Sequence, residues 1–91
     1  TMEGEFTKLR ERGPSRISPV FIPMMISNMA PGQISMNFGF KGPTMIVTTA
    51  CASSTNAIGE AYRMIKNGYL DMIVTGGSEA SITPISVAGF C

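Results

Sequence analysis

This sequence lacks an excess of charge of either sign, and it lacks long apolar runs. Lys and Arg together number 7 against 6 Asp and Glu, which leaves a net charge of +1. This balance provides no basic field for nucleic acid or for an anionic membrane surface. No apolar run approaches the roughly 18 residues that a membrane span needs, and no signal-peptide pattern opens the chain. We therefore expect a cytoplasmic protein that binds neither nucleic acid nor membrane.

Histidine is absent as well, and cysteine occurs only twice. Because no histidine or cysteine stands beside the eight methionines, we expect these to pack in a core or an interface, not to bind a metal. Cys51 lies inside an apolar segment and Cys91 is the last residue, so both thiols are expected to be reduced. The sequence predicts no metal and no cofactor.

The chain is short and apolar, with 91 residues of which 44% are hydrophobic. A chain of this size buries a small share of its surface, so much of the surface is expected to meet other protein. It begins Thr1-Met2 and stops inside an apolar stretch at Phe90-Cys91. We therefore expect residues 1–91 to be a fragment of one larger domain, incomplete at both ends.

One main helix is predicted in the first half, and an earlier segment allows either a short helix or a connector. Residues 3–16 are charged, with apolar side chains three positions apart, which suits either a short surface helix ended by a Gly-Pro pair or a solvated connector. Prolines predict that residues 17–23 are extended or irregular. A main helix is expected from about residues 28–30 to Gly39, because Pro31 is tolerated in a first turn.

The second half predicts a βαβ unit. The β-branched run at residues 44–49 and the apolar run at residues 71–75 are expected strands. Between them an apolar stripe at residues 57–65 predicts a helix that starts near Ala52 and ends before an Asn-Gly pair. The predicted class is α/β, and Glu79, after the second strand, is expected to be a buried structural acid.

Cys51 lies at the predicted junction of strand and helix. The first N–H groups of a helix lack intrahelical partners, and the macrodipole places partial positive charge there. Such a site favours a thiolate, and its N–H groups can hold the oxyanion formed when a thioester carbonyl is attacked. The small residues that follow Cys51 let a substrate approach closely. The alternative is an inert buried cysteine, the usual state of a free cysteine.

Residues 49–54 (TACASS), with Gly-Pro before them at 42–43, closely resemble the active-site segment of β-ketoacyl-acyl-carrier-protein synthases. Further stretches resemble the synthase II type of fatty acid synthesis, in the family's order and spacing. These are residues 18–23 (SPVFIP), 28–29 (NM), 76–79 (GGSE) and 89–90 (GF), together with Asn56, Gly59 and Ala61.

The resemblance implies a thiolase-like fold of two similar α/β halves in αβαβα layers, of which this chain is part of the first half, and a homodimer. It implies that Cys51 takes an acyl group from acyl carrier protein as a thioester, while its N–H forms half of an oxyanion hole. The acyl group then condenses with malonyl-acyl carrier protein, which loses carbon dioxide, to give a β-ketoacyl chain.

The resemblance also implies secondary sites. Phe21 matches a position that reaches toward the partner's acyl pocket, while Ser86 and Phe90 match positions that line their own pocket, and Ala50 belongs to the substrate-binding set. Ordinary packing is the alternative for these residues. Arg16 matches a basic residue that can contact the carrier protein, although a lone Arg in a charged loop is usually solvated.

The departures from the family limit what this chain can do alone. The family uses two catalytic histidines, and this sequence contains none. The second oxyanion donor also falls outside it, so the isolated chain is expected to be inactive. The alternatives are a polyketide ketosynthase or thiolase fragment, a subunit that shapes a pocket without chemistry, and an inert truncated chain. Thr48, where modular ketosynthases usually carry an acidic residue, favours the fatty acid type.

Overall fold

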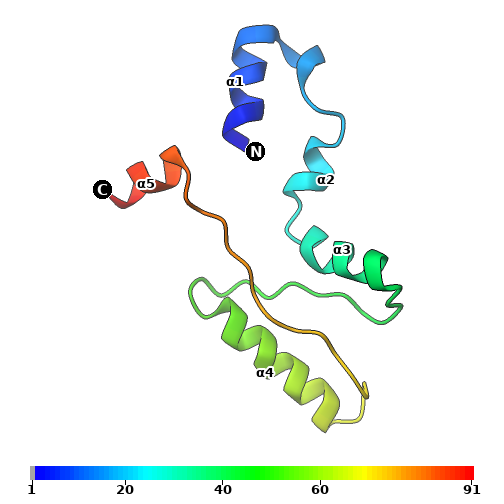
Figure 1. The fold of residues 1–91 in the computed structure, drawn as a ribbon. Coiled ribbons are helices and arrows are strands. Elements are labelled where there is room, and N and C mark those ends of the chain that lie inside the picture. The colour runs from blue at the N-terminus through cyan, green and yellow to red at the C-terminus, as the bar shows by residue number, and fades with distance from the viewer. Residues whose placement is uncertain (1) are drawn as a thin grey trace. The chain divides into compact units, whose positions relative to one another are not determined.

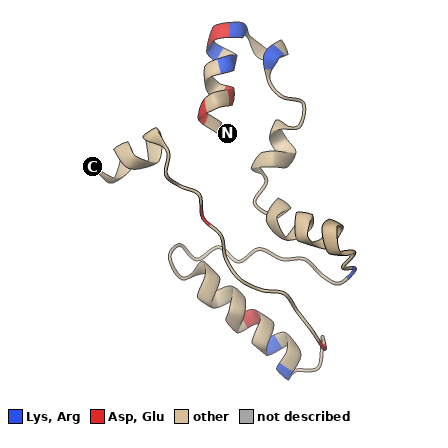
Figure 2. Ribbon diagram, in the orientation of Figure 1, with Lys and Arg blue, Asp and Glu red and all other residues tan. Residues whose placement is uncertain are grey.

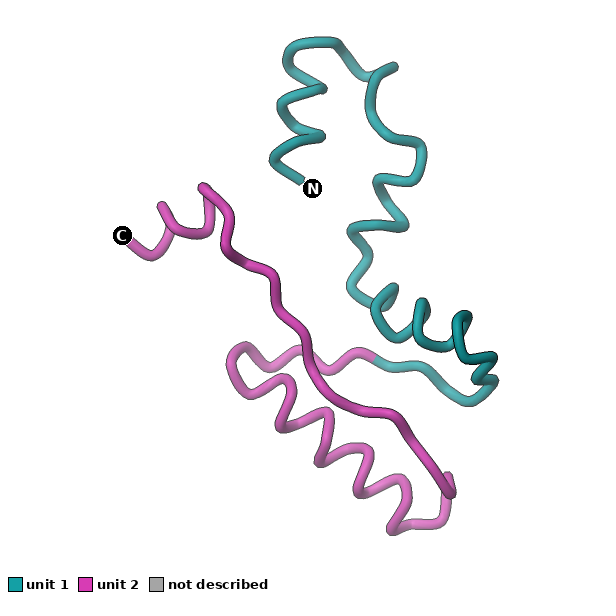
Figure 3. Tube along the Cα trace, viewed as in Figure 1, with its two compact units in different colours: residues 1–45 teal, residues 46–91 magenta. Residues whose placement is uncertain are grey.

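A computed structural model describes residues 2–91, and the chain divides between Met45 and Ile46 into two compact units (Figure 1, Figure 3). Among residues 2–91 the regular elements are helices, and the one β-type pairing is an isolated bridge between Thr49 and Cys51. The helices are α1 (Met2–Arg12), the short 3-10 helix η1 (Pro14–Arg16), α2 (Phe21–Met25), α3 (Met29–Phe38), α4 (Ser53–Lys66) and α5 (Pro84–Phe90).

Helix α1 decides between the two alternatives for the start of the chain, because this segment forms the surface helix and not a solvated connector. Its first turn carries Glu3 and Glu5 and its last turn carries Arg10 and Arg12, which complements the helix macrodipole (Figure 2). The helix ends before Gly13, whose φ of 81° lies in the left-handed region that glycine adopts without strain.

Glu5 is a buried acid that the sequence analysis missed. Only 8% of its surface is exposed. One carboxylate oxygen accepts from Lys8 Nζ at 2.6 Å and the other accepts from the Ser18 backbone N–H at 2.9 Å. These two hydrogen bonds hold the pKa of Glu5 below its ordinary value, and the bond from Lys8 has the larger effect. Glu79, the acid expected to be buried, is exposed, so that prediction was wrong.

Helix α2 corrects the expectation that residues 17–23 are non-helical. Phe21 begins the helix, and Pro23 falls inside its first turn, where a missing N–H loses no helical hydrogen bond. The Met24 N–H donates to the Val20 carbonyl at 3.0 Å. The expectation was therefore wrong for residues 21–23, where the first turn of a short helix accommodates Pro23, whereas residues 17–20 are non-helical as expected.

Helix α3 confirms the main helix predicted for the first half. Pro31 lies in its first turn, as expected. The helix ends at Gly39, whose φ of 68° forms a left-handed C-cap. Beyond this cap the Phe40 N–H donates to the Ser35 carbonyl at 3.0 Å, and the Phe38 and Phe40 rings stack with centroids 5.7 Å apart.

In the second unit, α4 confirms the predicted helix, and α5 was not predicted. Ala61 on α4 is only 4% exposed, and Lys66 in the last turn lies over the Tyr62 ring at 5.7 Å. Helix α5 begins after Thr83, whose hydroxyl accepts from the Ser86 N–H. A threonine cap followed by proline at the first helical position is a recognised start signal, and it could have identified α5 from the sequence.

The two predicted strands are not formed in the part of the chain that the structure describes. Residues 41–48 and 70–80 make no backbone–backbone hydrogen bond with any described residue. A strand exists only as one side of a hydrogen-bonded ladder, and β-branched composition provides a preference but no partner. The α/β arrangement expected here is therefore not confirmed by this structure.

Little apolar surface is buried. Ala61 is the one buried hydrophobic residue among those described, and large side chains such as Phe38, Met72 and Ile82 are exposed. Contact of this apolar surface with other protein stays a prediction. Within residues 2–91, no helix is both long enough and apolar enough to cross a bilayer.

Candidate active site

Cys51 lies on a tight turn that leads from an extended segment into α4. The Ala52 N–H donates to the Thr49 carbonyl at 3.0 Å and the Ser53 N–H donates to the Ala50 carbonyl at 3.1 Å. These bonds fold the backbone back immediately on either side of Cys51. Its thiol is free and exposed, so the alternative of a buried structural cysteine is wrong for this structure.

Ala50 adopts the unusual backbone conformation that makes the turn sharp. Its φ of 49° is the one positive value at a non-glycine residue in the described chain. A side chain in the left-handed region costs about 1–2 kcal/mol, because Cβ crowds the following carbonyl. Strain of this kind gathers at functional sites, where the surrounding structure holds it in place. Ala50 thus has a backbone role that composition alone did not reveal.

Ser53, the first residue of α4, holds the turn in place. Its hydroxyl accepts from the Thr49 N–H at 2.8 Å and donates to the Ala50 carbonyl at 2.6 Å. One turn later the Asn56 side-chain amide donates to the Thr49 hydroxyl at 2.8 Å. From the sequence, Ser53 was expected to act only as a small residue. A serine in a first helical turn is, however, placed to bond nearby backbone groups, and that signal could have found it.

The start of α4 gives the site its electrostatic character. The turn adjoins the N-terminus of this 14-residue helix, which is the positive end of the helix macrodipole. The N-cap residue Ala52 provides no side-chain hydrogen bond there. The N–H groups of Ala52 and Ser53 are used within the turn, whereas the described structure shows no hydrogen bond to the N–H of Cys51. A nucleophilic sulfur and an unused amide donor therefore occur on the same residue.

The remaining predicted residues of the second unit lie on α5. Ser86 is half-buried and its N–H donates to the Thr83 hydroxyl at 3.3 Å, while Phe90 is 95% exposed. No described hydrogen bond joins either residue to the turn around Cys51. Their substrate-binding roles stay predictions.

The first unit contains the other two predicted residues. Phe21 is half-buried at the start of α2, and Arg16 is exposed at the end of η1. The structure shows no hydrogen bond or ion pair from the Arg16 side chain to a described residue, so the guanidinium is available to a partner.

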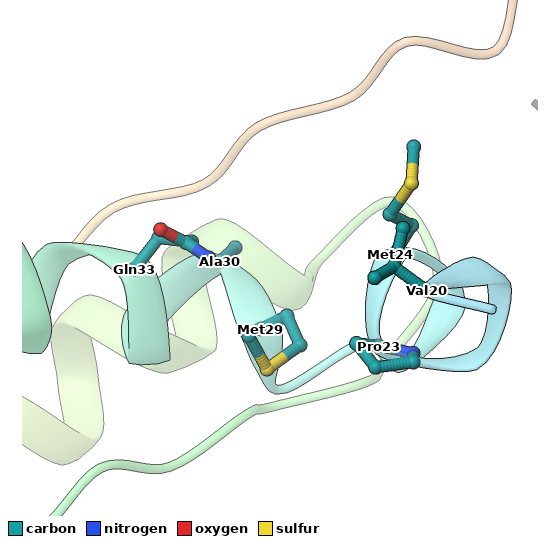
Figure 4. A pocket seen from close by; sticks show the side chains of 6 residues that line it. All are labelled: Val20, Pro23, Met24, Met29, Ala30 and Gln33. Atoms are coloured by element: carbon teal, nitrogen blue, oxygen red, sulfur yellow. The ribbon is translucent and has the colours of Figure 1, made fainter. Parts of the chain in front are cut away.

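A separate hollow of about 480 Å³ lies between α2 and α3 in the first unit (Figure 4). Gln33 supplies the one amide side chain in its wall, and the rest is apolar. None of the predicted site residues lines it, and it contains no nucleophilic or titratable side chain. Among residues 2–91 no three His, Cys, Asp or Glu side chains gather closely enough to hold a metal ion. The hollow is lined by Val20, Pro23, Met24, Met29, Ala30 and Gln33.

Comparison with known proteins gives a consistent result. Residues 1–91 match the family described as "Beta-ketoacyl synthase, N-terminal domain". A 3-oxoacyl-[acyl-carrier-protein] synthase 2 from Synechocystis sp. is 53% identical over 89 residues, which cover 98% of this chain and 21% of that protein. A synthase of the same name from Staphylococcus aureus is 48% identical over 90 residues, covering 99% of this chain and 22% of that protein. The chain thus spans only about a fifth of the length of these curated relatives.

Proposed function

Because the chain belongs to the β-ketoacyl synthase family, whose N-terminal domain its residues 1–91 match, we propose that it forms part of a 3-oxoacyl-[acyl-carrier-protein] synthase of fatty acid biosynthesis. In this proposal Cys51 carries the acyl group that is extended. The observation that carries it is the exposed, free thiol of Cys51 on a strained turn at the start of α4. The names of the relatives give no support to the polyketide ketosynthase and thiolase alternatives.

The first step is acyl transfer to Cys51. The sulfur attacks the thioester carbonyl of acyl-acyl carrier protein, so a new carbon–sulfur bond forms and the carbonyl oxygen becomes an oxyanion. The unused N–H of Cys51 donates to this oxyanion. Collapse of the intermediate breaks the bond to the carrier's sulfur, which leaves and takes up the proton that Cys51 gave up.

The second step is condensation. The bond to the carboxylate of malonyl-acyl carrier protein breaks, carbon dioxide leaves, and the electron pair stays on the adjacent carbon. This carbon attacks the acyl group, and the Cys51 sulfur departs as thiolate. The resemblance assigns the groups that drive decarboxylation to histidines, which this sequence lacks, so the residues of this chain serve acyl transfer and storage.

Partners and secondary sites complete the proposal. Phe21, Ala50, Ser86 and Phe90 contact the acyl chain, and the protein works as a homodimer in the cytoplasm, where Cys51 stays reduced. Acyl carrier protein approaches Arg16; the exposed guanidinium supports this, as do the basic residues in the last turn of α1 (Figure 2).

The test uses the full-length protein and acyl carrier protein loaded with an isotope-labelled acyl group. Peptide mass spectrometry is expected to find the label on Cys51, and Cys51→Ala is expected to reduce labelling to background. Cys91→Ala is the matched control, because Cys91 is also free and exposed but has no proposed role. Undiminished acyl transfer by Cys51→Ala would overturn the proposal.

A further inference from the structure

Gly77 passes unusually close to the first turn of α4. A Cβ atom at Gly77 would lie 2.7 Å from the Cβ of Ser54 and 3.4 Å from its Cα, and it would overlap the Ser54 hydroxyl. Carbon atoms in van der Waals contact lie about 3.5–4.0 Å apart. Any side chain at position 77 therefore requires the two segments to separate by about 1 Å.

Space alone explains the need for glycine at this position. The glycines with positive φ in the described chain are Gly13, Gly39 and Gly68, so Gly77 is not required for an unusual backbone conformation. Its neighbour Gly76 provides a direct contrast, because a Cβ there would meet nothing within 4 Å. The close approach is thus a property of residue 77, and it is not shared by the whole glycine pair.

The residue that Gly77 contacts is one position from the residue that holds the Cys51 turn. Ser54 follows Ser53, whose hydroxyl bonds both Thr49 and Ala50 on the near side of Cys51. If the first turn of α4 takes up this displacement of about 1 Å, those two bonds lengthen beyond hydrogen-bonding distance. A side chain at position 77 would then act on the turn through the backbone of α4, without touching the thiol.

We propose that Gly77 is a positioning residue for Cys51. Its missing side chain lets the segment around residues 76–79 lie directly on the first turn of α4, which fixes the backbone that presents the thiol. This inference rests on the proposed function of Cys51. A misplacement of about 1 Å in a reacting group can lower a rate by on the order of 100-fold, which sets the expected size of the effect.

The experiment compares three variants of the full-length protein: Gly77→Ala, the control Gly76→Ala, and the double variant Gly77→Ala/Ser54→Gly. The rate of Cys51 acylation from labelled acyl-acyl carrier protein is expected to fall on the order of 100-fold in Gly77→Ala and by less than about 3-fold in Gly76→Ala. The double variant is expected to recover most of the loss, because only the Ser54 Cα, at an ordinary contact distance of 3.4 Å, then faces the new methyl group.

Two outcomes would overturn the inference: equal rates in Gly77→Ala and Gly76→Ala, or a folded double variant no faster than Gly77→Ala. If Gly77→Ala fails to fold, the double variant alone tests the inference. A Cys51 acylation rate near that of wild type in the double variant supports the contact, and a large loss of rate in a folded double variant refutes it. Hydrogen exchange at residues 49–53 reports the turn without acyl chemistry. The two proposals can therefore fail separately. If the wild-type protein shows no acylation, but Gly77→Ala and not Gly76→Ala speeds exchange at residues 49–53, the proposed function is refuted and the positioning contact stands.

Discussion

Removal of the Ser53 hydroxyl tests how the Cys51 turn is held. Ser53→Ala deletes the bonds to the Thr49 N–H at 2.8 Å and to the Ala50 carbonyl at 2.6 Å. Both bonds are exposed to solvent, so each is assigned the lower end of the usual range, about 0.5–1 kcal/mol. The free energy of opening the turn is therefore expected to fall by about 1–2 kcal/mol, a factor of about 5–30 in the open population.

Hydrogen exchange followed by mass spectrometry measures this change locally in the full-length protein. The reporting amides are those of Thr49, Ala52 and Ser53, all of which donate within the turn. Their exchange is expected to speed up by about the same factor of 5–30, while amides in the middle of α4 keep their rates. Cys51 acylation is expected to slow in parallel, because the thiol is presented by the same backbone.

Thr55→Val is the matched control for Ser53→Ala. It removes a hydroxyl from the same helical turn, but the described structure shows no hydrogen bond to the Thr55 hydroxyl. Equal changes in the exchange of residues 49–53 in both variants would show that Ser53 does not hold the turn. An exchange rate in Ser53→Ala that matches wild type would show the same.

Two further predictions concern Glu5 and Ser86. Because the Lys8 hydrogen bond and then the Ser18 N–H lower the pKa of Glu5, its stabilising contribution is present at neutral pH and is lost as the pH falls through that lowered pKa. Hydrogen exchange of the Ser18 amide, followed as a function of pH, measures this loss. Lys8→Met is expected to move the midpoint of the transition to higher pH. An unchanged midpoint would contradict the pairing of Lys8 with Glu5. Ser86→Leu is expected to shorten the acyl chains accepted by the full-length protein, measured as product chain length. Ser86→Ala is the control, because it removes the hydroxyl without adding bulk. A Ser86→Leu product profile unchanged from wild type would assign Ser86 to packing.

Local signals predicted the longer helices well. The apolar stripe and the Asn-Gly stop gave α4, and Pro31 with Gly39 gave both ends of α3. Each of these signals acts within a few residues of chain, so no distant partner is needed to satisfy it. Strand pairing failed for the opposite reason, because a ladder depends on backbone groups that lie far away in sequence or outside the chain.

The candidate site could be predicted in position and not in detail. The motif around Cys51 and its place before a helix were read from the sequence, and the structure places the thiol there, exposed. The left-handed backbone of Ala50 and the bonds made by Ser53 depend on exact dihedral angles, which composition does not determine. Glu5 was missed because its burial depends on Ser18, which lies thirteen positions further along the chain.

The unpaired extended segments at residues 44–48 and 71–75 have a consequence for handling the protein. Each combines β-branched and apolar side chains with backbone groups that no described residue satisfies. An open edge of this kind is a template for another like it, and pairing between molecules leads to aggregation. Any partner that pairs with these two segments would therefore also keep neighbouring copies of the protein from joining edge to edge.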